Sequence, residues 1–267
     1  MSDPRPIGVF DSGLGGLSVA REIRSRLPDE SIIYIADSAY VPYGGRPLEE
    51  IRERSIVVTG ELVKRGAKMI IVACNTASGA AIEQLRARFS LPIVGLEPAV
   101  KPAAVSTRAG CIAVLATPAT LQTDRFHRLV DQHGEDVRIV KIPCPGYVEL
   151  VESGKMDDER ALEIVREPLM PAIQAGVDRV VLGCTHYPFL RELIRQVLGD
   201  GVEILDSGAA VARQVERVLV QHELAAGDPA DRSEPGSFTM LTTGDPGRVA
   251  PVASGLWGSP LTVGQVV

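Results

Sequence analysis

Two segments of the sequence have the same pattern, Met69-Ile-Ile-Val-Ala-Cys74-Asn-Thr76 and Arg179-Val-Val-Leu-Gly-Cys184-Thr-His186. Each begins as an apolar run typical of a buried strand and ends in a cysteine followed by polar residues. A helical stretch and another apolar run follow both of them. The cysteine lies equally far from that next run in the two cases, 74 to 92 and 184 to 202. The sequence therefore predicts a strand–helix–strand unit that occurs twice.

A second pair of similar segments lies upstream of the cysteines. Gly8-Val-Phe-Asp-Ser12 resembles Ala113-Val-Leu-Ala-Thr117, since each apolar run leads into a hydroxyl-bearing turn. Any two strand–helix units share such a rhythm, so the rhythm alone is weak support for a repeat. A cysteine at the same strand end in both halves is stronger support. We expect two similar halves related by a pseudo-two-fold axis.

The apolar runs also indicate the fold class. They are rich in Ile and Val and do not alternate with polar residues, as in parallel strands buried on both faces. The sequence predicts an α/β protein of two open α/β domains, with mostly parallel sheets around an interdomain cleft. The expected strands are Ile7–Phe10, Ile32–Ile35, Met69–Ala73, Ile93–Leu96, Ile112–Ala116, Val137–Ile142, Val180–Gly183 and Glu203–Leu205. The expected helices are Leu17–Leu27, Leu48–Arg65, Ala77–Phe89, Thr120–Gln132, Asp158–Ala175 and Pro188–Leu198.

The tail after about Asp206 contains no third copy of the unit, so we expect it to complete the first domain. The predicted domains are residues 1–97 plus 207–267, carrying Cys74, and residues 98–206, carrying Cys184. Ala225–Gly236 is polar and is expected to be an exposed loop. Ligands of open α/β sheets bind beyond the carboxyl ends of the strands, which would place both cysteines at one cleft.

Composition limits the function classes. The 267 residues carry a net charge of −6 and only 4% are aromatic, so a binding partner made of nucleic acid is not expected. The N-terminus has no charged and apolar regions typical of a signal peptide. No uninterrupted apolar run approaches the length of a membrane span. We therefore expect a cytoplasmic protein without a membrane partner.

Four cysteines occur, at Cys74, Cys111, Cys144 and Cys184, and none lies in a C-x-x-C motif. Redox pairs usually lie close in sequence, and a metal would need ligands beyond His186, so neither role is predicted. Acid–base chemistry suits the symmetric pair, because one thiolate can remove a proton from a stereocentre while the opposite thiol returns one. Both thiols are expected near a helix start, which lowers a thiol pKa. Cys111 and Cys144 are predicted to be structural.

The glycine-rich turn Asp11-Ser12-Gly-Leu-Gly-Gly16 follows the first predicted strand. Its N–H groups can bind an anion, although a tight turn that caps a helix would look the same. Beside a cysteine, Asp11 would be a proton relay or an acceptor for an ammonium group. Tyr43 and Gly44 lie in a loop that could close over a ligand or simply form a turn.

His186 lies two residues after Cys184, where it can share a proton with the thiol or hold it as thiolate. Spacing alone assigns no role to Glu152. Neutral hydrogen-bonding side chains at strand ends suit carboxylate recognition and serve equally well as helix caps. They are Asn75, Thr76, Thr117, Thr120 and Thr185.

Together these motifs resemble those of the glutamate racemases in the aspartate/glutamate racemase superfamily. The resemblance covers nearly the full length, and the two cysteine motifs in this order are specific to it. The last twenty residues are less typical. The matching segments are Phe10–Gly16, Ala36-Asp37, Pro42–Gly44, Ala73–Ser78, Leu150–Glu152, Gly183–Pro188, Asp206–Gly208 and Thr243–Pro246.

The resemblance implies that L- and D-glutamate are interconverted without pyridoxal phosphate or metal, in a bacterium that uses D-glutamate for peptidoglycan. Cys74 would act on the D-enantiomer with help from Asp11. Cys184 would act on the L-enantiomer with help from Glu152 and His186. Family members are often dimers, so a homodimer is expected. The residues that would hold the substrate are Asp11, Ser12, Tyr43, Gly44, Asn75, Thr76, Thr117, Thr120, Thr185 and His186.

Three alternatives remain open at this point. The nearest is a racemase for another substrate, such as aspartate or a hydantoin, although Thr-His-Tyr-Pro after Cys184 favours glutamate. A binding protein of the periplasmic type also has two α/β domains around a cleft, but no export signal supports it. The third is a regulator that binds a protein partner, for which the two cysteines would be dispensable.

Overall fold

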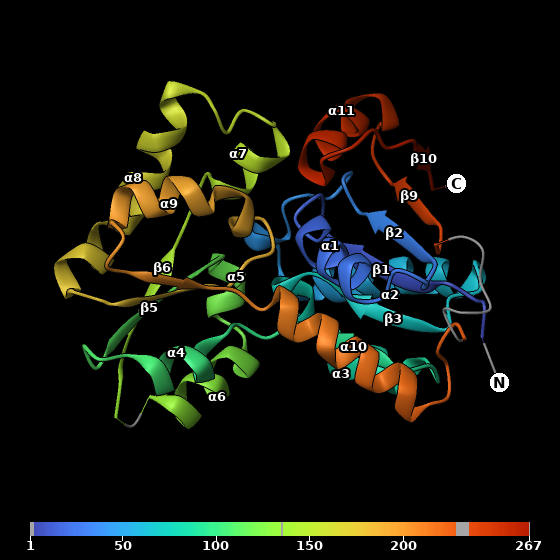
Figure 1. The fold of residues 1–267 in the computed structure, drawn as a ribbon, viewed down its shortest axis with the longest axis horizontal. Coiled ribbons are helices and arrows are strands. Elements are labelled where there is room, and N and C mark those ends of the chain that lie inside the picture. The colour runs from blue at the N-terminus through green and yellow to red at the C-terminus, as the bar shows by residue number, and fades with distance from the viewer. Residues whose placement is uncertain (1–2, 135, 228–234, 267) are drawn as a thin grey trace.

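The computed structural model describes residues 3–134, 136–227 and 235–266. Within these ranges the chain forms two lobes that lie side by side, each built on a sheet with helices on both faces (Figure 1). The strands are β1 Ile7–Asp11, β2 Ile32–Ala36, β3 Met69–Val72, β4 Ile93–Gly95, β5 Cys111–Ala116, β6 Arg138–Pro143, β7 Arg179–Leu182, β8 Glu203–Leu205, β9 Phe238–Thr242 and β10 Val263–Gln265.

The two sheets repeat one strand order. The first has six strands in the order β10-β9-β2-β1-β3-β4, and the second has four in the order β6-β5-β7-β8. The β2-β1-β3-β4 part of the first sheet therefore matches the second sheet strand for strand. Every strand pair in the described residues is parallel. The predicted α/β class and the predicted repeat are confirmed.

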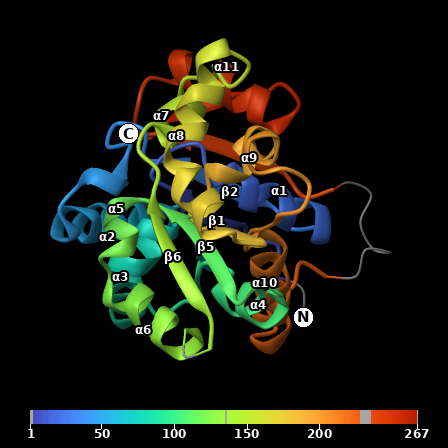
Figure 2. The same cartoon turned by 90° about the vertical axis from the view of Figure 1, so that its left-hand side faces the viewer.

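Helices cover both faces of each sheet (Figures 1 and 2). In the first lobe α1, α10 and α11 pack on one face and α2 and α3 on the other, whereas the second lobe places α8 and α9 opposite α4 and α6. The helices are α1 Leu17–Arg26, α2 Leu48–Lys64, α3 Asn75–Arg88, α4 Val100–Ser106, α5 Pro118–Leu121, α6 Asp124–His133, α7 Tyr147–Glu152, α8 Glu159–Ala175, α9 Arg191–Leu198, α10 Gly208–Gln221 and α11 Pro246–Trp257, with 3-10 turns η1 Tyr43–Gly45 and η2 Tyr187–Leu190.

Helix α8 shows how local sequence sets these elements. Val165, Leu169 and Ala172 recur at helical spacing and are fully buried against the second sheet. The side chain of Asp158 caps the first turn by accepting the Arg160 N–H, and the helix ends at Gly176 in the left-handed conformation, φ 64°. The predicted helix and its boundaries follow from these signals.

The chain after α9 returns to the first lobe. Helix α10 packs against α1, and β9 pairs with β2 and extends that sheet. This topology is compatible with domains of 1–97 plus 207–267 and 98–206, a division that we keep as a proposal. The largest hydrophobic cluster contains side chains of both lobes, for example Leu14 and Leu150, so the lobes share an apolar core.

Three expectations were wrong in detail. The predicted helix at 120–132 is two helices, because Thr123 accepts the Phe126 N–H and caps a new helix there. The predicted helix at 188–198 begins as the 3-10 turn η2. Ala226, expected in an exposed loop, is buried, while residues 228–234 of that loop lie outside the described residues. Elements that were not predicted are α4, α7, α10, α11, β9 and β10.

Among the described residues, no helix combines the length and the apolar composition that crossing a bilayer requires.

A buried ion pair ties together segments that are distant in the sequence. Lys68, just before β3, places its Nζ 2.6 Å from Glu30 Oε2, and the side chains are 0% and 4% exposed. Lys68 also donates to the Asp3 carbonyl, and Glu30 accepts the Ala226 N–H at 2.8 Å. The pair therefore joins the N-terminal segment, the first sheet and the returning tail.

Lys68→Met is expected to lower the free energy of unfolding by about 3–5 kcal/mol, because it leaves the Glu30 carboxylate buried without its cation. Denaturant unfolding followed by circular dichroism measures the change. The double variant Lys68→Met/Glu30→Leu should recover most of the loss. A single variant as stable as the wild type would contradict this account of the pair.

Candidate active site

The predicted site residues gather where the carboxyl ends of the two sheets meet. Asp11 ends β1 and Cys74 follows β3 in the first lobe. Thr117 and Cys184 follow the equivalent strands β5 and β7 in the second lobe. Both cysteines are buried, at 5% and 7% exposure. The repeat thus brings one thiol from each lobe to one region, as the sequence predicts.

Cys74 is the N-cap of α3. Its Sγ accepts the Ala77 N–H at 3.4 Å and lies 4.0 Å from Ser12 Oγ. Burial raises the pKa of the thiol above its ordinary value, and the nearby charge of Asp11 raises it further, while the Ala77 N–H acts in the opposite direction. The expected lowering of this pKa is therefore wrong, because desolvation outweighs the helix start. At rest the geometry favours a protonated Cys74.

Cys184 has different surroundings. No α-helix starts at it, since η2 intervenes before α9 begins at Arg191. The expected helix dipole is therefore missing on this side. Instead Cys184 Sγ lies 3.7 Å from His186 Nδ1, so an imidazole replaces the helix N-terminus as the partner of the thiol.

Glu152, which the spacing left without a role, lies beside His186. Its Oε1 is 2.6 Å from His186 Nε2. Burial lowers the pKa of His186, but the contacts with Cys184 and Glu152 and the charge of Asp11 outweigh it, so the pKa lies well above its ordinary value. This arrangement favours an imidazolium between the Cys184 sulfur and the Glu152 carboxylate.

The glycine-rich turn binds an anion, and that anion is Glu152. Leu14 donates its N–H to Glu152 Oε1 at 2.6 Å, across the junction between the lobes. A Cβ at Gly13 would lie 2.1 Å from the same oxygen, and one at Gly15 would lie 2.2 Å from His186 Nδ1. Glycine is needed at both positions because the turn approaches the partner side chains this closely.

Asp11 makes a second polar contact across the junction. It is fully buried, and its Oδ2 accepts from Thr185 Oγ1 at 2.9 Å while its Oδ1 accepts the Gly13 N–H at 2.7 Å. Burial raises the pKa of this carboxyl, against the opposing effects of His186 and the hydrogen bonds. A carboxyl with a raised pKa is well suited to exchange a proton with a neighbouring thiol.

Three threonine hydroxyls form a triangle at the junction. Thr76 Oγ1 lies 2.9 Å from Thr117 Oγ1 and 3.0 Å from Thr120 Oγ1, and the last two are 2.9 Å apart. Thr117 also caps α5 by accepting the Thr120 N–H. The helix-cap interpretation is therefore confirmed for Thr117, and carboxylate recognition by these hydroxyls stays a prediction.

Tyr43 and Gly44 form the 3-10 turn η1 and pack against this triangle. Tyr43 is buried among side chains that include Cys74 and Ala119. A Cβ at Gly44 would lie 2.7 Å from Thr117 Cβ, so the turn touches the second lobe closely. All ten predicted substrate-binding residues therefore lie around this junction.

The model of the Asp/Glu/hydantoin racemase family matches residues 14–215. The chain belongs to this family. It is 52% identical to the glutamate racemase of Ectopseudomonas mendocina over 226 residues, which cover 84% of this chain and 86% of the relative. Membership makes the chain an isomerase and confirms the resemblance read from its motifs.

Solved structures of glutamate racemases are similar to this chain in fold. The Escherichia coli glutamate racemase, in complex with L-glutamate and the activator UDP-MurNAc-Ala, is 34% identical with a TM-score of 0.85 over 98% of each chain. The Francisella tularensis glutamate racemase in complex with D-glutamate is 27% identical, with a TM-score of 0.84 over 99% of this chain and 98% of that one. The lobes of this racemase are thus arranged as in these enzymes.

Of the remaining cysteines of the racemase, Cys111 begins β5 at the opposite end of the second sheet, whereas Cys144 follows β6 at the carboxyl end. Cys111 Sγ accepts from Arg138 Nε at 3.3 Å, and Cys144 Sγ donates to the Ile142 carbonyl at 3.6 Å. All four thiols are free. Within the part of the chain that the structure describes, no group of three or more His, Cys, Asp and Glu side chains is placed to hold a metal ion.

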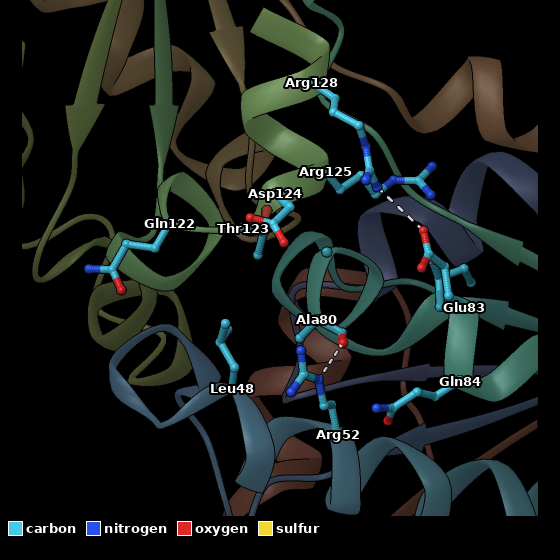
Figure 3. Close-up of a pocket in the computed structure, with 12 residues that line it drawn as sticks. Leu48, Arg52, Ala80, Glu83, Gln84, Gln122, Thr123, Asp124, Arg125 and Arg128 are labelled. Carbon is cyan, nitrogen blue, oxygen red and sulfur yellow. Dashed lines mark hydrogen bonds and ion pairs between the residues drawn. The ribbon is translucent and has the colours of Figure 1, made fainter.

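A separate pocket of about 180 Å³ lies between α2, α3 and the α5–α6 segment (Figure 3). None of the predicted site residues lines it. Its charges are largely satisfied from within, because Arg128 pairs with Glu83 at 3.3 Å and Arg52 donates to the Ala80 carbonyl at 3.0 Å. The pocket is therefore distinct from the junction that holds the two thiols.

Asp37 is a buried charged residue that sequence reasoning noted only within a motif. Its carboxylate accepts from the Tyr43 hydroxyl and from Arg54. The signal was present, because Asp37 directly follows β2 and Asp11 ends the neighbouring strand β1. Its position, as a charged side chain directly after an apolar strand, could have identified Asp37 as a candidate site residue.

The raised pKa of His186 predicts how stability depends on pH. In the unfolded chain the pKa of an imidazole is about 6.5. The pKa of His186 is higher in the folded state, so the folded state binds the proton more tightly. The stabilisation from His186 is then complete below about pH 6.5 and is lost as the pH rises through the folded pKa. The difference in unfolding free energy between the wild type and His186→Gln should be largest at about pH 6 and shrink toward about pH 9.

Denaturant unfolding at several pH values measures this difference, and His127→Gln, at an exposed position, controls for the loss of a histidine. A difference that grows with rising pH would overturn the assignment of an imidazolium at His186.

Proposed function

We propose that this racemase interconverts L- and D-glutamate with Cys74 and Cys184 as its two acid–base groups, without a cofactor or a metal. The observation that carries the proposal is the pair of buried thiols, one from each lobe, each near an ionisable side chain, Asp11 for Cys74 and His186 for Cys184. Relatives of this family that are similar over nearly the whole chain bind L-glutamate and D-glutamate.

In the direction from L to D, the reaction starts with the Cys184 proton already on His186 Nδ1, so that Cys184 is a thiolate and Glu152 stabilises the imidazolium. The Cys184 thiolate removes the α-proton of L-glutamate. The Cys74 thiol, kept protonated by its raised pKa, delivers its proton to the opposite face. D-glutamate leaves, with Cys184 as thiol and Cys74 as thiolate, and Asp11 helps Cys74 to exchange its proton.

The α-proton of an amino acid is weakly acidic, so the developing charge needs preorganised donors. We expect the hydroxyls of Thr76, Thr117 and Thr120 to supply such donors, since they lie together in a buried site and each can turn toward a bound substrate. Asn75 Oδ1 is a buried acceptor without a hydrogen-bond partner among the described residues, which suits the substrate ammonium. The other groups in contact with the substrate would be Ser12, Tyr43, Gly44, Thr185 and His186.

Three further parts of the proposal rest on the family resemblance. The D-glutamate formed would be used for peptidoglycan, the enzyme would work in the bacterial cytoplasm, and two chains would associate as a homodimer. The curated relatives are bacterial glutamate racemases, which supports the first part.

Cys74→Ser and Cys184→Ser should each lower racemisation by at least about 10²-fold, because a hydroxyl is a far weaker acid than a thiol. In D₂O, Cys74→Ser should still bring deuterium into L-glutamate and Cys184→Ser into D-glutamate, since each keeps the base for one enantiomer. Polarimetry and NMR of the α-position measure the two effects. Cys111→Ser is the control.

Full racemisation by either variant would refute the two-base mechanism. A wild-type chain that moves no deuterium into either enantiomer would instead support a binding protein or a regulator.

Glutamate is expected to be the best substrate in a panel of L-amino acids followed by circular dichroism. The reason is that solved glutamate racemases in complex with L- and D-glutamate are similar to this chain over nearly its whole length. A dominant rate on aspartate would sink the assignment to glutamate.

A further inference from the structure

The Asp37 carboxylate is fully buried, and the proposed mechanism does not use it. Four donors surround it. Its Oδ2 accepts from the Tyr43 hydroxyl at 2.5 Å and from Arg54 Nε at 3.0 Å, and its Oδ1 accepts from Arg54 Nη2 at 2.8 Å and from Thr243 Oγ1 at 2.8 Å. A buried charge with this full set of charge-assisted hydrogen bonds has little freedom to move.

The donors come from three separate segments. Tyr43 belongs to η1, Arg54 to α2, and Thr243 follows β9 in the C-terminal tail. Arg54 is itself held, because its guanidinium lies 3.8 Å from the centroid of the Tyr40 ring. The Asp37 carboxylate is thus anchored from a helix on one side and from the tail on the other.

Thr243 holds more than the carboxylate. Its Oγ1 also accepts the Ala39 N–H at 3.2 Å, and its own N–H donates to the Ala36 carbonyl at 3.0 Å. The start of the segment that runs from β2 to η1 is therefore fastened to the end of β9. Residue 243 lies beyond residues 14–215, which the family model matches.

The other end of that segment reaches the proposed substrate site. Tyr43 is buried with Cys74 in one cluster, and Gly44 lies against Thr117 of the second lobe. A shift of η1 would therefore move the groups that face the threonine triangle. The contacts form one continuous path, from Thr243 through Asp37 and Tyr43 to the junction of the lobes.

We propose that Thr243 and Asp37 are positioning residues, through which the C-terminal tail holds Tyr43 and Gly44 in the geometry that binds substrate. This inference rests on the proposed function. In this proposal the C-terminal tail contributes to substrate binding, although it contains none of the proposed catalytic residues.

Thr243→Val tests the path, because valine keeps the shape of threonine and removes the hydroxyl. KM for glutamate should rise about 3- to 10-fold in both directions while kcat stays within about 2-fold. Thr239→Val is the matched control, since Thr239 is exposed on the same strand. Its KM should equal that of the wild type.

A role confined to folding would give a different result. It would lower kcat in proportion to the folded fraction and leave KM unchanged, which would overturn the proposal. An equal rise of KM in Thr239→Val would overturn it as well.

Hydrogen–deuterium exchange without substrate gives a readout that does not depend on the reaction. Amides of residues 38–46 should exchange faster in Thr243→Val and at the wild-type rate in Thr239→Val. If the wild-type chain racemises no glutamate, the proposed function fails while this readout still tests the path. Unchanged exchange in Thr243→Val would refute the anchoring itself.

A double-mutant cycle tests whether Thr243 acts through Tyr43. Tyr43→Phe removes the hydroxyl that binds Asp37 and keeps the ring. In that background Thr243→Val should raise KM less than it does alone, because the path is already broken. Effects on KM that multiply independently would contradict the proposed path.

Discussion

The carboxylate of Glu152 is the contact on which the rest of the site depends. It lies at the junction of the lobes, where it accepts the Leu14 N–H from the first lobe and binds His186 of its own lobe. The two bonds could not form together with the lobes apart. The same carboxylate therefore joins the two lobes and contacts the imidazole, so the surroundings of His186 depend on how the lobes are arranged.

The repeat provides two equivalent strand ends, and the local surroundings make them unequal. Cys74 lies at a helix start, but burial and the charge of Asp11 keep its proton on the sulfur. Cys184 lacks the helix and has His186 instead. The proposed mechanism needs an acid on one side and a base on the other, and desolvation at Cys74 and the imidazole beside Cys184 make the two surroundings unequal in this way.

Buried charge recurs through the structure and constrains it. Asp11, Asp37, Glu30 and Lys68 are all nearly inaccessible to solvent, and each is surrounded by donors or acceptors from distant segments. Removing one partner of such a buried group lowers the free energy of unfolding far more than removing one partner of an exposed ion pair does. Two of the four, Asp11 and Asp37, lie at or beside the proposed site, where the same contacts hold the neighbouring side chains in place.

The sequence by itself determined the α/β class, the repeat, both strand-end cysteines and most of the residues around them. These features are local, since apolar runs, caps and motifs are readable within a few residues. Only the tertiary structure decided the partners of those residues. Asp11 meets Thr185 across 174 positions, Leu14 meets Glu152 across 138, and Thr243 meets Asp37 across 206. Helix dipoles alone predicted lowered thiol pKa values, and the opposite direction at Cys74 arises because desolvation depends on how completely the two lobes enclose it.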